Sequence, residues 1–515
     1  MTSTERSQTS NGTAGTQAPA GSSRDSLAGA GWRCAEVGVP PAGGRSFSWI
    51  DPVPLWQSRN QTLARLLGDP TNDERRLWMR LQSEAGELHD DLVVDEGAGR
   101  REGREEVSFI VIGDTGEGDA SQQAVVDPLL ARGLDTDFMV VCSDVIYPAG
   151  DAEDYDAKFY GPYEAYPRRI YALPGNHDWY DGLVGFMHHL CGADVSALPA
   201  VEERPSSPKG RLRRLLWRRP AQRDREDLPA RRRTDEGRRT DQRSPYFAID
   251  AGPLLLVGID TGMGGPIDRE QAAWLRRVSR GEGPKILLTG KPLYVDGERH
   301  PYPMEDGGTV DEVVLDPAHN YVAAIGGDIH NYQRYEVDVA GREAPLQYIV
   351  SGGGGAYMSA THRIPKVDLH GVDEDHFVCY PRRGDSLSFY SKLYDRRFGL
   401  GLGLLRISPG EAAAYMAERL RIKATRPEDR ATRVGRRARC AADWIFPLPN
   451  SGRNLLHNFF SEFFDWNDPP LFKNFLRIDA SEGEVRIRCF AATGCAEHAQ
   501  DPPLEDEVRI PLPRT

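Results

Sequence analysis

The sequence lacks any long apolar run, and this absence narrows the class of protein. Within its 515 residues no stretch of about 18 apolar residues occurs, so no transmembrane helix is predicted. Residues 1–31 are rich in Ser, Thr, Gly and Ala and contain no apolar core of a secretory signal. These features favour a soluble protein, and we expect it to be cytoplasmic.

Cysteine is also scarce. The seven cysteines are odd in number and widely spaced, which is typical of reduced thiols rather than of a disulfide framework. Cys489, Cys495 and His498 could be considered as zinc ligands, but their spacing fits no common zinc finger. Cysteine therefore adds no strong functional signal and supports the cytoplasmic prediction.

The chain as a whole carries no excess of positive charge. The net charge of -13 argues against nucleic acid as the main partner. The exception runs from Arg204 to Arg243, where fifteen Lys and Arg stand against six Asp and Glu, a local charge of +9. Because this stretch is poor in apolar residues, we predict a disordered insertion at residues 203–244. A solvated loop is the simpler interpretation, and a tether to anionic lipid, nucleic acid or an acidic partner is the alternative.

The remaining chain divides into five parts. Residues 1–45 are predicted to be a disordered tail, and residues 46–105 a helical segment that includes TNDERRLWMRLQSEAGEL. Between residues 106 and 360 short apolar strands alternate with helical stretches, which indicates an α/β core. Residues 361–450 form an accessory segment of unassigned role. Residues 451–515 contain a predicted hairpin that turns at Glu482 and Gly483 and packs on the core.

Metal-competent side chains follow four of the predicted strands, at the points where the apolar runs VSFIVI, DFMVVC, RRIYAL and YVAAIG end. They are Asp114, Asp144, Tyr147, Asn176, His177, Asp178, Asp328 and His330. In an open α/β sheet, ligands gather at the carboxyl ends of the strands, so we expect these residues to lie together. Each one alone has an ordinary explanation, such as a turn or a helix cap. Their recurrence at four strand ends favours a metal site. A dinucleotide loop is excluded because the glycines of GDTGEG do not fall at G-x-G-x-x-G.

The motifs GDTG, SDVIY, GNHD and GDIHNYQRY occur in this order between Val107 and Tyr357. In this the chain resembles the calcineurin-like metallophosphoesterase superfamily. The resemblance implies an α/β fold in which two mixed β-sheets, flanked by helices, form a four-layer sandwich. Gly116, where many members carry a histidine, and Tyr147, three residues after Asp144, are similar to the purple acid phosphatase branch.

The resemblance further implies a centre of two divalent or trivalent metal ions, Mn, Fe, Mg or Zn. Asp114, Asp144, Tyr147 and His330 would hold the first metal. Asp144 would bridge to the second, which Asn176 and Asp328 would also bind. His177 would act on the phosphoryl group or the leaving oxygen, and Asp178 would orient it. A metal-bound hydroxide would then hydrolyse a phosphomonoester or a phosphodiester.

Two positions depart from the family pattern. Gly290, in LLTGKPLY, stands where the family usually has a metal-binding histidine, and Asp328 replaces the first histidine of the last motif. Asp328 can still bind a metal through oxygen, whereas Gly290 cannot bind through a side chain, and His300, His319 or Lys291 are the candidates to fill the gap. The weakened second site leaves open a non-catalytic metal- or phosphate-binding scaffold. The arginine-rich insertion leaves open a membrane- or nucleic-acid-associated regulator.

Overall fold

The structure is a computed structural model and describes most of the chain outside the two ends and several internal stretches. The described residues are 52–57, 71–97, 106–199, 228–423, 432–446, 472–492 and 502–512, with the single positions 208 and 211. The predicted tail at residues 1–45 lies outside them, as do Cys495 and His498.

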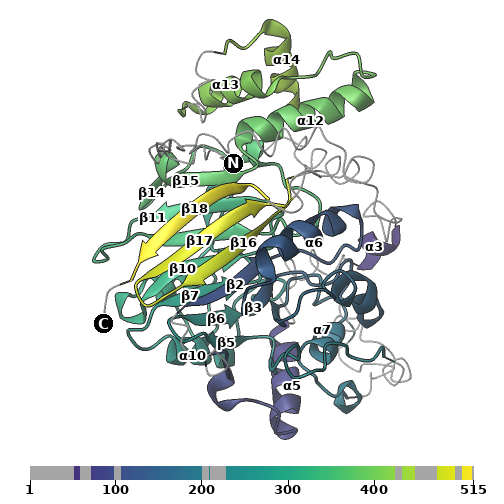
Figure 1. The fold of residues 1–515 in the computed structure, drawn as a ribbon, viewed down its shortest axis with the longest axis vertical. Helices are drawn as coiled ribbons and strands as arrows, with labels where there is room; N and C mark the ends of the chain where they lie inside the picture. Colours follow the sequence, from purple (N-terminus) through teal and green to yellow (C-terminus); the bar gives the residue numbers. More distant parts are fainter. Residues whose placement is uncertain are drawn as a thin grey trace, which may run out of the picture.

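Two mixed β-sheets form the body of the molecule (Figure 1). The first has six strands, in the order β18 (Leu504–Pro511), β17 (Glu484–Ala491), β16 (Asn474–Ala480), β2 (Val107–Ile112), β3 (Phe138–Cys142) and β4 (Arg169–Leu173). The second has eight, in the order β1 (Val93–Asp95), β5 (Phe247–Asp250), β6 (Leu255–Ile259), β7 (Lys285–Thr289), β10 (Tyr321–Gly326), β12 (Leu346–Ser351), β11 (Tyr332–Val337) and β15 (Phe377–Tyr380). Two small hairpins join β8 (Tyr294–Val295) to β9 (Glu298–Arg299) and β13 (Asp368–Leu369) to β14 (Val372–Asp373).

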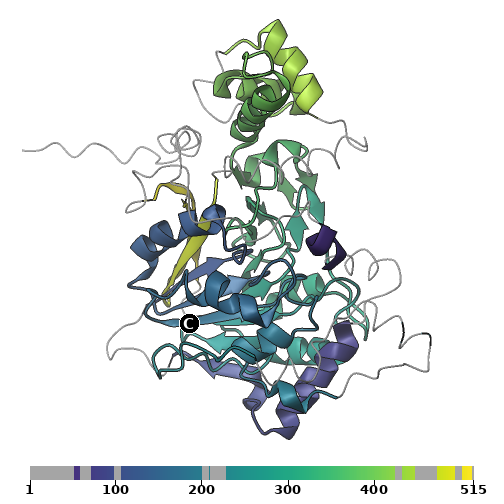
Figure 2. The ribbon, with the colours of Figure 1, turned by 90° about the vertical axis from the view of Figure 1, so that its right-hand side faces the viewer.

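Helices cover the outer faces of the sheets and form a lobe at one end. Around the sheets lie α3 (Pro52–Gln57), α5 (Thr71–Glu84), α6 (Ala120–Gly133), α7 (Val184–His189), α10 (Arg269–Val278) and α11 (Val310–Leu315). The lobe consists of α12 (Arg383–Phe398), α13 (Pro409–Leu420) and α14 (Arg436–Ile445), which stand above the sheets in Figure 2. Among the described helices, none has the length and apolar character needed to cross a membrane.

Side chains along each strand point alternately to the two faces of the sheet, and this alternation separates the cores of the sandwich. In β2, Phe109 and Val111 enter a core that they share with residues of the eight-stranded sheet, including Leu256 and Ile325. Their neighbour Ile110 faces the other way, into a core built with helix α6. A third core lies between the eight-stranded sheet and helices α10 and α11. The predicted α/β sandwich of two mixed sheets flanked by helices is confirmed.

Parallel pairing brings strand ends together. Strands β2, β3 and β4 run parallel to one another, and so do β6, β7, β10 and β12. Within each sheet the carboxyl ends of these strands therefore lie at one edge. The C-terminal strands extend the six-stranded sheet, because β16 pairs antiparallel with β2 along five residues.

Part of the arginine-rich segment differs from the prediction. Residues 228–244 were predicted to be disordered, but the structure places them against the six-stranded sheet. The amide of Gln242 bonds both backbone groups of Ala172 on edge strand β4, at 3.0 and 2.7 Å. Arg233 donates to the backbone carbonyls of Tyr163, Tyr166 and Arg168. Hydrogen bonding, which composition does not report, orders this stretch, and the assignment of residues 228–244 is corrected.

Candidate metal centre

The loops that follow β2, β3, β4 and β10 meet where the carboxyl edges of the two sheets adjoin. The backbone N–H of Asp328, after β10, donates to Asp114 Oδ1, after β2, at 3.1 Å. The N–H of Gly354, after β12, donates to the carbonyl of Gly113 at 3.0 Å. These bonds link the two sheets, so the predicted residues of both come together at one place.

The hydroxyl of Tyr147 lies at the centre of the cluster. It is 3.0 Å from Asp144 Oδ2, 3.3 Å from Asp114 Oδ1 and 3.2 Å from His330 Nε2. All four side chains are buried. A phenol carries one proton, so it can satisfy only one of these three acceptors by hydrogen bonding. The oxygen and nitrogen lone pairs that face one another here outnumber the protons available to them, and a bound cation would stabilise this arrangement.

His330 presents the tautomer that a metal ligand needs. Its Nδ1 lies 2.8 Å from the carbonyl of Tyr357, a bond that requires a proton on Nδ1 and leaves the lone pair on Nε2. Burial, with the nearby Lys473, lowers the pKa of His330 to about 3, so the ring is neutral at pH 7. Nε2 faces Tyr147 and Asp114.

Asp114 offers a buried oxygen with room beside it. Among the described residues its Oδ2 has no hydrogen-bond partner. A Cβ at Gly352 or Gly327 would come within 2.5 or 2.8 Å of this oxygen, so two glycines keep larger side chains away. Burial and the carboxylates of Asp144 and Asp328 raise the pKa of Asp114 well above its usual value. A buried carboxylate crowded by two others is stabilised by a positive ion.

Backbone strain is concentrated at the same place. Asp114, Ser143, Asp144 and Asp328 all have positive φ, at 58°, 92°, 39° and 66°. Side chains other than glycine rarely adopt this region, and such residues cluster at functional sites because the surrounding fold imposes the conformation. Three of the four are carboxylates predicted to bind metal.

The spacing of these donors fits a metal ion. Ligands at about 2.1 Å from an octahedral ion lie about 3.0 Å apart when adjacent and about 4.2 Å apart when opposite. The distances from the Tyr147 hydroxyl, 3.0 to 3.3 Å, and the 3.9 Å from His330 Nε2 to Asp114 Oδ1 fall in this range. In the part of the chain that the structure describes, His, Cys, Asp and Glu side chains alone form no metal cage of three or more.

Asn176 and His177 join the cluster from strand β4. The backbone N–H of His177 donates to Asp144 Oδ1 at 2.8 Å, so the two oxygens of Asp144 face different neighbours. The Asn176 amide donates to the hydroxyl of Tyr180 at 3.2 Å, which leaves its Oδ1 as an acceptor. Asp144 therefore lies between the Tyr147 group and the Asn176 loop, where a bridging carboxylate would stand.

Part of the chain is similar to proteins of a known family. Residues 107–332 match the calcineurin-like phosphoesterase family. This part of the chain is similar to that family. The resemblance inferred from the four motifs is confirmed.

Solved structures give weaker likenesses to the whole chain. A purple acid phosphatase from yellow lupin (Lupinus luteus) seeds is 10% identical with a TM-score of 0.39, covering 79% of this chain and 54% of that one. A structure of PhoD is 10% identical with a TM-score of 0.33, covering 79% and 69%. GAP50 of Plasmodium is 9% identical with a TM-score of 0.32, covering 54% and 81%. The chain spans about half the length of the lupin phosphatase. No curated protein matches it.

Asp178 binds backbone N–H groups and not the ring of His177, which it was predicted to orient. Its carboxylate accepts three backbone N–H groups, from Val145, Ile146 and Gly175, at 2.9 to 3.1 Å. The ring of His177 is held instead by the carbonyl of Pro148, 2.8 Å from Nδ1. The prediction that Asp178 orients His177 is corrected, because Asp178 fixes the backbone of the loops after β3 and β4.

The two atypical glycines of the matched region are explained by close backbone contacts. A Cβ at Gly290 would lie 2.7 Å from the carbonyl oxygen of Pro174, just before Asn176. Gly290 therefore lies against the loop that carries Asn176, without space for a ligand side chain. A Cβ at Gly116 would lie 1.9 Å from the carbonyl oxygen of Val145, so no histidine fits there.

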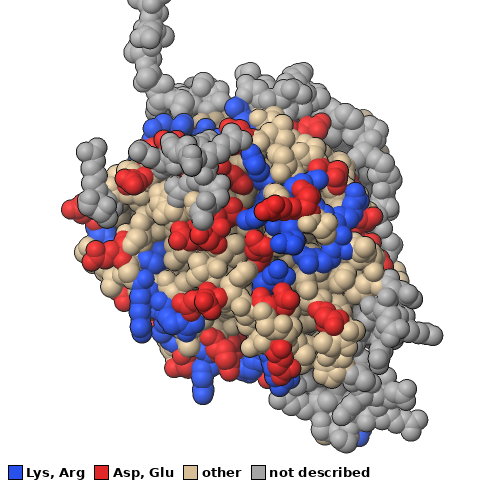
Figure 3. All heavy atoms as spheres, turned by 60° about the horizontal axis from the view of Figure 1, so that its bottom comes forward, with Lys and Arg blue, Asp and Glu red and all other residues tan. Residues whose placement is uncertain are grey.

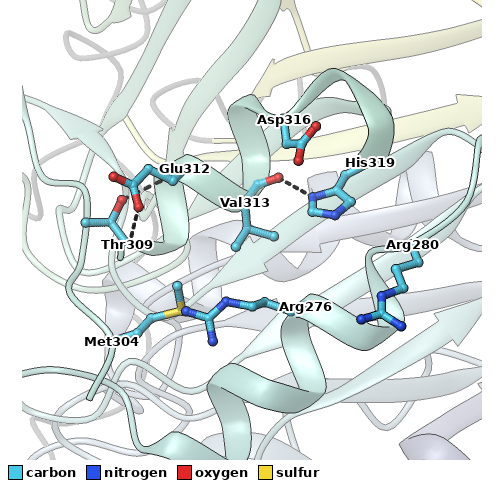
Figure 4. A pocket seen from close by; sticks show the side chains of 8 residues that line it. All are labelled: Arg276, Arg280, Met304, Thr309, Glu312, Val313, Asp316 and His319. Carbon is cyan, nitrogen blue, oxygen red and sulfur yellow. Dashed lines mark hydrogen bonds between the residues drawn. The ribbon is translucent and has the colours of Figure 1, made fainter. Parts of the chain in front are cut away.

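The candidates to replace a ligand at Gly290 make their contacts elsewhere. Lys291 donates to the carbonyl of Met263. His300 is exposed and pairs with Glu298 at 3.8 Å. His319 lines the pocket of about 300 Å³ shown in Figure 4, with its Nδ1 on the carbonyl of Val313 at 2.8 Å. None of the strand-end residues lines that pocket.

Two contributions to the site come from outside residues 107–332, and no sequence motif predicted them. Lys473, just before β16, is buried and close enough to lower the pKa of His330. Helix α5 supports the loop after β4, because Trp78 Nε1 donates to the carbonyl of Gly182 at 2.9 Å. Both come from distant parts of the chain, and neither segment carries a motif. The metal and catalytic roles themselves stay predictions.

Proposed function

We propose that the chain is a metal-dependent hydrolase of phosphate esters. The observation that supports this most is the convergence of Asp114, Asp144 and His330 on the Tyr147 hydroxyl, with one proton among three acceptors. Asp114, Asp144, Tyr147 and His330 would hold a first ion, and Asp144, Asn176 and Asp328 a second. Bound ions of this kind lower the pKa of a water and neutralise the charge of a phosphoryl group.

The chain's own groups would position the substrate and move a proton. The His177 ring is half-buried between the rings of Tyr147 and Tyr180, with centroids 4.5 and 4.9 Å away. Because the carbonyl of Pro148 accepts from Nδ1–H, Nε2 is the atom that would face the leaving oxygen, and the ring would have to carry a second proton there, as an imidazolium, to donate it. The same geometry serves a phosphomonoester and a phosphodiester. The cytoplasmic location and an anionic partner for residues 204–243 also stay predictions.

Metal analysis with turnover of an aryl phosphate monoester and diester tests the proposal. His330→Ala should lose bound metal and reduce turnover by at least about a hundredfold. His319→Ala is the matched control, because both histidines hold Nδ1 on a backbone carbonyl at 2.8 Å. His177→Ala should lower turnover while the metal content stays that of wild type. If His330→Ala and His319→Ala behave alike, the proposed centre is wrong.

A non-catalytic scaffold is the second candidate function, and Gly290 favours it. With a Cβ position only 2.7 Å from the Pro174 carbonyl oxygen, this position cannot supply the ligand of a second ion. Protein that retains one metal and hydrolyses neither ester with excess Mn²⁺ would support the scaffold. Turnover that requires added Mn²⁺ or Mg²⁺ would support the hydrolase with an oxygen-rich second site.

A further inference from the structure

The loop that leaves α12 exposes an unusually apolar surface. Leu400, Leu402 and Leu404 are 80%, 70% and 58% exposed, and Phe398 at the end of α12 is 50% exposed. Trp444 on α14 is 46% exposed, and its ring centroid is 5.9 Å from that of Phe398. We refer to residues 398–404 with Trp444 as the leucine tip. A contiguous exposed apolar patch of this kind marks an interaction site.

The leucine tip is held in shape by its own hydrogen bonds. The buried carboxylate of Asp395 accepts from the N–H groups of Gly403 and Leu405 at 2.7 and 2.8 Å. Its carbonyl accepts from Gly401 at 2.9 Å. The guanidinium of Arg437 donates to the carbonyls of Gly403, Leu404 and Arg406.

This pairing suits an apolar environment. In water, loop backbone groups are solvated at little cost, but in the acyl region of a bilayer each unpaired group costs several kcal/mol by rough estimate. The N–H groups of Gly401, Leu402 and Gly403 and the carbonyls of Gly403 and Leu404 are paired inside the protein, while the leucine side chains are exposed. The glycines at 401 and 403 have φ of 71° and 77°, which allows the tight turns that expose every second side chain.

Positive charge surrounds the tip. The exposed arginines near it are Arg396, Arg397, Arg406, Arg436 and Arg437. Arg406 and Arg437 also line a cavity of about 240 Å³, together with Gly403, Ser408 and Glu411.

Two acids lie on the neighbouring helices. Glu411 caps α13, and Asp443 accepts from the hydroxyl of Tyr415 at 2.6 Å. On the face seen in Figure 3, with the lower end of Figure 1 turned forward, basic and acidic side chains are interspersed.

The lobe stands at one end of the molecule, above the two sheets (Figures 1 and 2). We propose that the leucine tip docks the protein on an anionic lipid bilayer. The leucines and Phe398 would enter the boundary between headgroups and acyl chains, Trp444 would lie at headgroup depth, and the exposed arginines other than Arg437, which holds the loop, would face lipid phosphates. This inference rests on α12–α14 alone and does not depend on the proposed hydrolysis.

Co-sedimentation of the full chain with vesicles tests the proposal. Wild type should bind vesicles of phosphatidylcholine with phosphatidylserine more tightly than vesicles of phosphatidylcholine alone, and added salt should weaken binding. Leu400→Ser with Leu402→Ser should reduce affinity by about tenfold or more. Leu134→Ser is the matched control, because Leu134 is a 52% exposed leucine at the end of α6. Circular dichroism should show all variants folded.

The basic surround is tested separately. Arg396→Gln with Arg397→Gln should weaken binding to the anionic vesicles only, whereas the exposed Arg280→Gln should not. Wild type that fails to bind, or equal loss in the Leu134→Ser control, overturns the proposal. A dimer that the leucine double variant dissociates, without any vesicle binding, would assign the tip to a second copy and also overturns it. Binding that Asp144→Asn abolishes would place lipid recognition at the candidate metal centre instead.

Discussion

Arg75 of helix α5 is buried between two acids, and its removal should strongly destabilise the protein. Its guanidinium donates to Asp260 Oδ2 at 2.9 Å and to Asp268 Oδ2 at 2.6 Å, with all three side chains almost fully buried. Arg75→Met keeps most of the aliphatic stem but leaves two buried carboxylates without their cation. Breaking a buried ion pair in this way costs about 3–5 kcal/mol of unfolding free energy.

The size of this loss should depend on pH. Burial alone would raise the pKa of Asp268, but Arg75 and the N–H of Gln271 outweigh burial and hold it below its usual value. A carboxyl group with a lowered pKa stabilises the fold above its unfolded pKa of about 3.9 and loses that contribution as the pH falls through the folded value. In Arg75→Met the charge that opposes burial most is lost and the N–H of Gln271 remains, so the pKa of Asp268 should rise and ionisation near neutral pH should be destabilising. The difference between wild type and variant should therefore be larger at about pH 7 than at about pH 4.5.

Urea unfolding followed by tryptophan fluorescence measures both effects. Arg76→Met is the matched control, because the neighbouring Arg76 is 34% exposed and pairs with Glu270 and Glu305 at the surface. Screening by water limits its contribution to about 1 kcal/mol or less. The buried ion pair would be refuted as a main support of α5 if the two variants lose equal stability, or if the loss in Arg75→Met is the same at both pH values.

Two further predictions concern close backbone contacts. Gly290→Ala should destabilise the protein by about 1–3 kcal/mol in urea unfolding, since its Cβ would lie 2.7 Å from the Pro174 carbonyl oxygen; an unchanged midpoint would contradict the packing. Gln242→Ala should lower the free energy of unfolding by about 1–3 kcal/mol, because both backbone groups of Ala172 lose their partner. Deletion of residues 205–227 should leave the unfolding midpoint close to that of wild type. A Gln242→Ala protein whose midpoint equals that of wild type would show that the ordered part of the segment does not depend on Gln242.

The sequence predicted which strand ends come together better than it predicted the contacts that hold them. Asp114, Asp144 and Asp328 could be located because each follows an apolar strand, and parallel strands bring their ends together. The role of Asp178 could not, since its three partners are backbone N–H groups that carry no sequence signal. The order of residues 228–244 could not be predicted from composition either. It depends on hydrogen bonds such as that of the Gln242 amide with Ala172, 70 residues away.

Resemblance to the family could not reveal what lies outside residues 107–332 either. Lys473 reaches the site only because β16 pairs with β2, more than 360 positions earlier in the chain. Arg75 reaches it through Asp260, which accepts from Trp179 Nε1 at 3.1 Å, close to His177. Both links depend on tertiary contacts that local patterns do not encode.

These links make a last prediction about the matched region itself. Strand β2 is buried along its whole length, and one of its edges is covered only by β16, in register from Val107 with Ala480 to Val111 with Leu476. A fragment of residues 106–332 would leave that edge unpaired, and it would also lack β12, which pairs with β10 beside the site. Exposed apolar strand edges associate with one another. We therefore expect the fragment to aggregate on expression, whereas residues 71–512 should give soluble protein with cooperative unfolding. A soluble fragment that unfolds cooperatively and binds metal as the longer protein does would show that the family region forms its site without the flanking strands.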